Sequence, residues 1–156
     1  MAKINFKSVG KTSDTLAAET PDQSTLPVGI MTPLRFGSTG EGIFAMHFDL
    51  GDQIQDNLRN LILTNWGERL GQFDFGANLK QLTTEFVSID NFDAEATLRI
   101  KNAVSKWMPY VTLQDFISTT NHTENQKTGI ISFTITYGVP MLNISARALE
   151  ITLYVL

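Results

Sequence analysis

The sequence contains no cysteine and only two histidines among its 156 residues. Disulfides and thiolate zinc sites are therefore excluded, although the absence of cysteine does not by itself fix the compartment. His47 and His122 lie far apart in the chain. We therefore interpret His47 as a packed or surface residue rather than a metal ligand. Neither a metal nor a cofactor is expected.

The sequence also lacks an excess of basic residues. Twelve Lys and Arg against 16 Asp and Glu give a formal net charge of −4, with a pI near 5.1. Proteins that bind nucleic acid usually present a basic face, so no nucleic-acid partner is expected. No apolar run is long enough to span a membrane, and the N-terminus lacks the apolar segment of a signal peptide. These absences predict a soluble protein made in a cytoplasm, without a membrane partner.

Sequence motifs of the common catalytic sites are missing as well. The glycine-rich segment 37–42 lacks the Gly-Lys-Ser/Thr ending of a phosphate-binding loop. No Gly-x-Ser-x-Gly occurs. The carboxylates of Glu68 and Asp74 are the remaining candidates, for glycoside hydrolysis, which needs one carboxyl group held protonated. Arg69 beside Glu68 favours an ionised Glu68, so we predict no catalytic residue and no enzyme, with a cell-wall glycosidase as the least favoured alternative.

The sequence is organised around residues 58–86, where an amphipathic helix leads into a segment rich in glycine. The helix is expected to begin at Asp49 or Gly51 and to end at Gly67. Residues spaced by three or four share its apolar face: Leu50, Ile54, Leu58, Leu61 and Ile62. Asp52, Gln55, Asp56 and Arg59 are placed mainly on the opposite face.

Residues 67–76, called the corner below, are predicted to form a built structural motif rather than a loose loop. Its defining residues are Gly67, Glu68, Arg69, Asp74, Phe75 and Gly76. We expect the rings of Phe73 and Phe75 to be buried on either side of Asp74. The planar fork of Arg69 suits a bidentate contact with the carboxylate of Asp74.

The rest of the chain predicts an α+β fold. A short helix over 77–86 is followed by a helix over about 94–107, capped by Asp90 or Asp93 and ended by Pro109. Trp107 is assigned to the core rather than to an interface. Period-two alternation then predicts strands around 111–117, 131–137 and 149–155. We expect a small sheet of about three strands packed against two main helices. The sheet is expected to be antiparallel, and a mixed sheet is the alternative.

Residues 1–28 are predicted to be a separate extended arm, and residues 29–156 one domain. The arm is too poor in large apolar residues to bury much surface by itself. A flexible tail and an arm that orders on a partner both remain open. Its possible anchors are Ile4, Phe6, Leu16 and Leu26.

Several spaced motifs resemble the baseplate wedge family of contractile phage tails, also called sheath initiators, with relatives in type VI secretion baseplates. Upstream, Gly29-Ile30 and the segment 33–36 are similar to the start of the family's domain. The residues that carry the resemblance are Ile62, Leu63, Thr64, Gly67, Glu68, Arg69, Asp74, Phe75, Gly76, Leu79 and Leu82. Members of the family have sometimes been labelled lysozymes.

The resemblance implies a structural protein of the virion, in six copies in the tail baseplate and assembled in the host cytoplasm. Its partners would be baseplate wedge proteins and the tail sheath protein, with the tail tube or hub as a further possibility. The first sheath ring would polymerise on it by β-strand augmentation. A regulatory or adaptor domain of the same fold that works outside a tail is the alternative.

Two segments are assigned to these contacts. The family usually carries Glu-Pro-Arg after its last long helix, where this chain has Met108-Pro109-Tyr110. We expect wedge docking here through apolar burial and a phenol hydrogen bond instead of ion pairs. The sheath contact is assigned to the last strand, although an ordinary internal strand would show the same pattern. Its alternating apolar residues are Leu149, Ile151, Leu153 and Val155.

Overall fold

The structure is a computed structural model that describes residues 26–37, 42–85, 89–121 and 129–155. The chain divides into two compact units, Met1–Gln53 and Ile54–Leu156, and each is described by itself. The predicted arm falls almost wholly outside the described residues, so it stays a prediction.

The described part of the first unit is a two-stranded antiparallel ribbon. Strand β1 (Gly29–Ile30) pairs with β2 (Met46–His47), and a bridge between Phe36 and Phe44 continues the pairing. His47 is buried, which agrees with a packed histidine. The unit ends in the first turn of helix α2 (Leu50–Leu63). Asp49 caps that helix, because its Oδ2 accepts the N–H of Asp52 at 3.1 Å.

The second unit contains the rest of α2 and two further helices, α3 (Leu79–Glu85) and α4 (Ile89–Trp107). Four of the five predicted apolar residues of α2 are buried, whereas Leu50 is 44% exposed. Asp56 was expected on the polar face but is buried. Its charge is matched by Arg59, whose Nη1 lies 2.8 Å from Asp56 Oδ1, and this pairing makes the burial of a carboxylate tolerable.

The start of α4 differs from the prediction. The helix begins at Ile89, so Asp90 and Asp93 lie inside it and Asp93 does not cap it. Asp93 instead accepts a hydrogen bond from the hydroxyl of Ser118 on the sheet. The helix ends at Trp107, two residues before Pro109, as predicted.

The sheet is antiparallel and has the order β3-β4-β5. Its strands are β3 (Thr112–Asn121), β4 (Gly129–Val139) and β5 (Ile144–Val155). A short 3₁₀ helix, η1 (Pro140–Leu142), joins the last two strands, and the left-handed Asn143 closes it. A small antiparallel sheet with helices confirms the predicted α+β fold.

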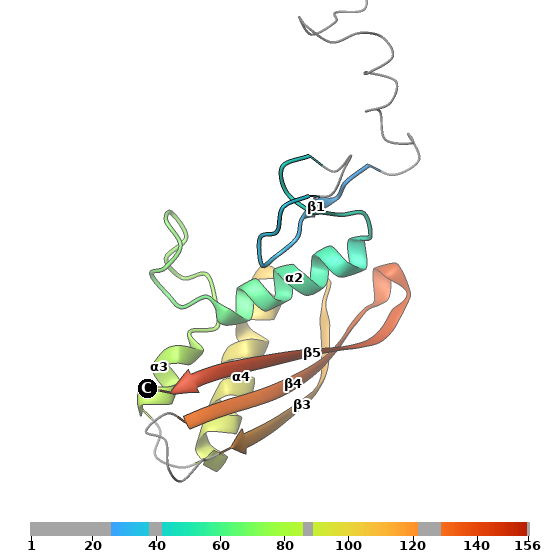
Figure 1. Ribbon diagram of the computed structural model, residues 1–156. Coiled ribbons are helices and arrows are strands. Elements are labelled where there is room, and N and C mark those ends of the chain that lie inside the picture. Colours follow the sequence, from blue (N-terminus) through green and yellow to red (C-terminus); the bar gives the residue numbers. More distant parts are fainter. Residues whose placement is uncertain (1–25, 38–41, 86–88, 122–128, 156) are drawn as a thin grey trace, which may run out of the picture. The chain divides into compact units, whose positions relative to one another are not determined.

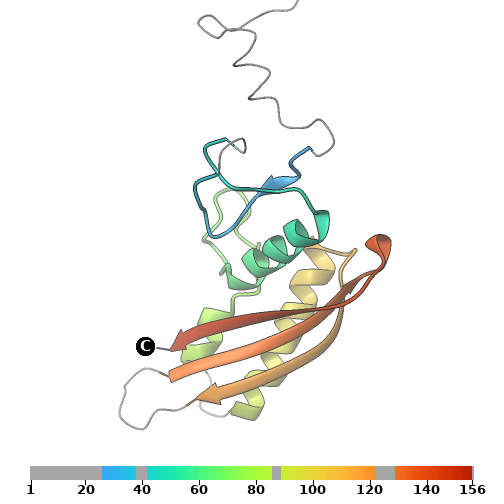
Figure 2. The ribbon, with the colours of Figure 1, turned by 45° about the vertical axis from the view of Figure 1, so that its right-hand side comes forward.

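Helices α3 and α4 cover one face of this sheet, as Figures 1 and 2 show. The core lies between the two layers. The inward residues of β4 and β5 include Phe133, Ile135, Tyr137, Leu149 and Ile151, and all are buried. The other face of the sheet carries mainly hydroxyl side chains from β4 and β5: Ser132, Thr134, Thr136 and Thr152.

Candidate functional site

The C-terminal end of α2 sets the position of the corner. The helix ends at Leu63, four residues earlier than predicted, because two hydrogen bonds replace its continuation. The N–H of Asn65 donates to Glu68 Oε2 at 2.7 Å. The carbonyl of Leu61, which Asn65 would have used in a longer helix, accepts the N–H of Ala77 at 3.2 Å. The chain that leaves α2 is thus joined to the chain that returns from the corner.

Gly76 makes the closest backbone approach of the corner. Its φ of +112° is a conformation that residues with a Cβ rarely adopt. A Cβ at this position would meet the carbonyl oxygen of Thr64 at 2.1 Å. The carbonyl of Gly76 also accepts the indole N–H of Trp66 at 3.1 Å. Glycine is therefore required where the corner closes on the end of α2.

Asn65 connects the corner to helix α3. Its Nδ2 donates to Glu68 Oε1 at 2.9 Å, and its Oδ1 accepts the N–H of Lys80 in the first turn of α3 at 3.1 Å. Hydrogen bonds from the Asn65 backbone and side chain lower the pKa of Glu68, and the charge of Lys80 adds to the effect. Glu68 is therefore ionised, as expected, but Asn65 rather than Arg69 is the cause.

The predicted pairing of Arg69 with Asp74 is wrong. Asp74 is bound by the ammonium group of Lys106 from the last turn of α4, and this hydrogen bond lowers the pKa of the Asp74 carboxyl group. The guanidinium of Arg69 lies over the ring of Phe75 instead, with its Cζ 4.3 Å from the ring centroid. Lys106 reaches Asp74 from another element, a contact that the local sequence does not show.

The two phenylalanines of the corner also differ from the expectation. Phe75 is half-buried and packs against the core, with its ring edge-on to Trp107 at a centroid distance of 5.2 Å. Phe73 is 64% exposed and Leu70 is 93% exposed. The tip of the corner therefore presents apolar side chains to solvent, and only its base is buried.

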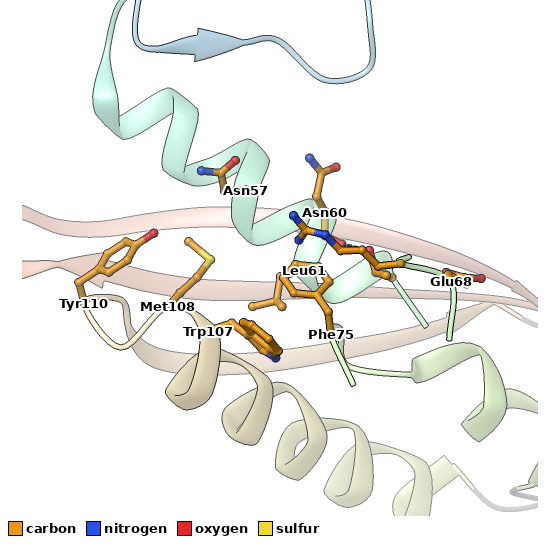
Figure 3. A pocket seen from close by; sticks show the side chains of 10 residues that line it. Asn57, Asn60, Leu61, Glu68, Phe75, Trp107, Met108 and Tyr110 are labelled. Carbon is orange, nitrogen blue, oxygen red and sulfur yellow. Dashed lines mark hydrogen bonds between the residues drawn. The ribbon is translucent and has the colours of Figure 1, made fainter. Parts of the chain in front are cut away.

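The corner and the segment after α4 line one hollow of about 650 Å³. Figure 3 shows Phe75 beside Trp107, with Asn57 and Asn60 of α2 above them and Tyr110 on the far side of Met108. The structure thus brings two separately predicted segments together. The residues that line the hollow are Asn57, Asn60, Leu61, Thr64, Glu68, Arg69, Phe75, Trp107, Met108 and Tyr110.

The three residues of the predicted docking segment have different environments. Met108 is buried in the core with 5% exposure, whereas Tyr110 is 38% exposed. Pro109 is exposed. Trp107 packs against the core and also lines the hollow. The phenol of Tyr110 is therefore available to a partner, while Met108 mainly supports the fold.

The two carboxylates that could act as a glycosidase pair line different hollows. Glu68 lines the one just described, whereas Asp74 lines another, of about 330 Å³, together with Lys106 and Trp66. The pKa is lowered in both groups. A general acid needs the opposite shift, so neither of these two carboxylates has the raised pKa that such a role requires.

In the described ranges, no group of three or more His, Cys, Asp or Glu side chains is placed to hold a metal ion. Among the same residues, no helix is both long and apolar enough to cross a membrane.

Among the described strands, β5 lies at one edge of the sheet and pairs with β4 alone. Leu149 and Ile151 point into the core, and Leu153 packs against it. The side chain of Val155 lies outside the described residues. Three of the four side chains predicted for the sheath contact, Leu149, Ile151 and Leu153, therefore belong to the unit's own core.

Sequence analysis did not identify Asn65, Trp66 or Lys106 as parts of the site. Asn65 carried a usable signal, because asparagine just after a helix often bonds to nearby backbone groups. Lys106 carried no such signal, because nothing in the sequence links it to Asp74, 32 residues away.

No family model and no curated protein matches this sequence. A chain in the cryo-EM structure of the anti-feeding prophage baseplate, symmetrised sixfold, aligns with a TM-score of 0.52 and 19% identity, over 79% of this chain and 81% of that chain. A "putative tail lysozyme" from Geobacter sulfurreducens aligns with a TM-score of 0.53 and 19% identity, over 69% of this chain and 93% of that chain. The chain therefore has a fold that is also found in the baseplate of the anti-feeding prophage.

Proposed function

We propose that this protein is a structural subunit of a contractile-tail baseplate, which joins the wedge proteins and templates the first ring of tail sheath. The observation that carries the proposal is the position of β5 at the sheet edge. The shared fold with a chain of a prophage baseplate supports it. The motifs of the corner, which resemble those of sheath initiators, agree with it.

The sheath contact would be made by the backbone of β5. This strand spans 12 residues, and an edge strand presents unpaired N–H and C=O groups on its outer side. Because Leu149 and Ile151 are anchored in the core, the strand is held in an extended form before any partner arrives. A sheath strand can then add to the sheet without the ordering cost that a flexible segment would carry.

The wedge contact would be made at the hollow beside the corner. Tyr110 lies at its rim with a partly exposed ring, and the amides of Asn57 and Asn60 line the same space. Aromatic rings with a polar end are common anchors of protein interfaces. Met108 is not expected to touch the partner, which narrows the docking segment to Tyr110 and the corner.

A structural role also agrees with the chemistry of the carboxylates. Both Glu68 and Asp74 are ionised, and each is held by a neighbour that orders the corner. An acid with a lowered pKa cannot protonate a glycosidic oxygen efficiently near neutral pH. We therefore assign no catalytic step to this site.

The proposal is tested by mixing the purified protein with the purified sheath and wedge proteins of the same phage. Co-sedimentation measures binding, and negative-stain imaging detects short sheath rings. The proposal predicts wedge binding and sheath rings that form only when this protein is present. Wedge binding without sheath rings would remove the template role, and binding to neither would favour an adaptor domain outside a tail.

Tyr110→Ala is the matched test of the wedge contact. Tyr110 is partly exposed and Met108 is buried, so Tyr110→Ala removes a surface ring whereas Met108→Ala would leave a cavity in the core. The proposal predicts weaker wedge binding by Tyr110→Ala with an unchanged melting temperature. Leu98→Ala, which removes a 52% exposed side chain of α4, is the control and should bind normally.

A further inference from the structure

The guanidinium of Arg69 is held in place but has no acidic partner in the described part of the chain. Its Cζ lies 4.3 Å from the centroid of the Phe75 ring, and that ring packs edge-on against Trp107. Phe75 and Trp107 are both half-buried, so the aromatic pair forms a fixed support for the cation. Stacking on a ring occupies one face of a guanidinium and leaves the N–H donors at its edge for another acceptor.

The two carboxylates next to Arg69 in the sequence are both bound by other groups. The oxygens of Glu68 accept the N–H and the Nδ2 of Asn65, at 2.7 and 2.9 Å. Asp74 is bound by Lys106. The corner therefore contains two acids that could neutralise Arg69, and its hydrogen bonds direct both of them elsewhere.

Arg69 lines the same hollow as Tyr110, and Leu70, the next residue, is 93% exposed. A cation and a phenol thus line one concave surface, and an exposed aliphatic residue follows the cation in the sequence. The charge of Arg69 selects an anion. The ionised Glu68 on the same hollow opposes a highly charged polyanion such as a nucleic-acid backbone.

We propose that this hollow receives an Asp or Glu side chain of a wedge protein, which pairs with Arg69 while an apolar neighbour on the partner packs against Leu70. The inference rests on the wedge contact proposed above and names its chemistry. Planar carboxylate and guanidinium groups form two parallel hydrogen bonds, so the pair sets the orientation of the partner as well as adding affinity. The ion pair is made by the corner, and Tyr110 of the segment after α4 lines the same hollow.

The first test compares Arg69→Gln with Lys101→Gln in binding to the purified wedge proteins by calorimetry. Both variants lose one positive charge, and Lys101 is an exposed residue of α4 that does not line this hollow. Loss of a charge-assisted hydrogen bond predicts about ten- to a hundredfold weaker binding by Arg69→Gln. Lys101→Gln is expected to stay within about twofold of the wild type, as for an exposed charge away from the contact.

The second test identifies the partner's acid. In Arg69→Lys, a carbodiimide would activate the partner's carboxyl group, and the new amine would displace the urea to form an amide. Mass spectrometry should find one cross-linked Asp or Glu that is absent with wild type and with Arg69→Gln. Reversing both charges, Arg69→Glu with Arg at that acid, should restore binding that either change alone weakens.

The outcomes separate this inference from the proposed function. If the wild type binds wedge proteins but Arg69→Gln binds as tightly as Lys101→Gln, the carboxylate contact is wrong and the wedge role stands. If the wild type binds no wedge protein, the wedge role and the contact that rests on it both fail. An unchanged melting temperature of Arg69→Gln confirms that weaker binding does not come from unfolding.

Discussion

The α-carbon of Gly76 lies so close to the end of α2 that a Cβ there would meet the carbonyl oxygen of Thr64 at 2.1 Å. This contact explains why the corner needs a glycine at its last position. It also places Ala77 and Asn78 where their N–H groups can donate to Leu61 and Thr64. The direction in which the chain enters α3 depends on this approach.

Gly76→Ala is expected to destabilise the protein strongly. The substitution combines a left-handed φ with a clash against backbone, which cannot move as a flexible side chain can. We expect a loss of roughly 3 kcal/mol or more in the free energy of unfolding, measured by urea denaturation. Gly71→Ala is the control, because Gly71 has a φ of +79° but nothing within 4 Å of an added Cβ. It should cost only about 1–2 kcal/mol, and equal losses in the two variants would show that the approach to Thr64 is unimportant.

Asn65→Ala is expected to raise the pKa of Glu68 toward the ordinary value of 4.5. The backbone N–H of Asn65 still donates in this variant, so the shift is partial. The variant also loses the acceptor of the Lys80 N–H, a capping-type contact worth about 1 kcal/mol. An NMR titration of the Glu68 side chain measures the pKa, and Asn102→Ala, on the exposed surface of α4, is the control. A Glu68 titration identical to that of the wild type would contradict the role given to Asn65.

The same hydrogen bonds predict how stability changes with acid. The pKa of Glu68 is lower in the folded protein than in the unfolded chain. The ionised Glu68 therefore stabilises the fold at pH values above the unfolded-state pKa. This stabilisation is lost as the pH falls through the folded-state pKa. The Asn65→Ala variant should therefore differ from the wild type more at pH 7 than at pH 2 in urea denaturation. A difference that grows on acidification would reverse this sign and reject the explanation.

Leu149→Ala and Thr152→Ala separate the two faces of β5. Leu149 is fully buried and Thr152 is exposed. Truncating the buried leucine should cost about 2–5 kcal/mol, whereas the threonine should change stability by no more than about 0.5 kcal/mol. Thermal denaturation of both variants measures the contrast. Similar losses would mean that β5 is not anchored through its inner face.

Periodicity predicted the parts of the fold in which residues share a face with near neighbours. The spacing of Leu58, Leu61 and Ile62 identified the buried side of α2, and the alternation of Phe133 and Ile135 identified the inward face of β4. These patterns can be recognised because a buried face requires apolar residues at a regular spacing along the element.

The site could be predicted less completely, because its contacts join residues that are distant in sequence or compete for one partner. Asp74 is close to Arg69 in the sequence, but in the structure it binds Lys106 of α4. The guanidinium of Arg69 lies over the ring of Phe75 instead. Helix α2 ends at Leu63, earlier than predicted, because the backbone N–H of Asn65 donates to the Glu68 carboxylate instead of continuing the helix. Such choices depend on tertiary geometry rather than on propensity.

The most direct test of the template role is a photochemical cross-link from β5 to the sheath protein in assembled baseplates. The chain has no cysteine, so Thr152→Cys on the edge strand introduces a single thiol to which a benzophenone maleimide is attached, and Ile117→Cys on β3, at the other edge and labelled in the same way, is the matched control. The account predicts that Thr152→Cys couples to the sheath subunit in high yield and that Ile117→Cys does not. Coupling from Ile117→Cys alone, or from neither position in baseplates that carry sheath, would contradict β-strand augmentation at β5.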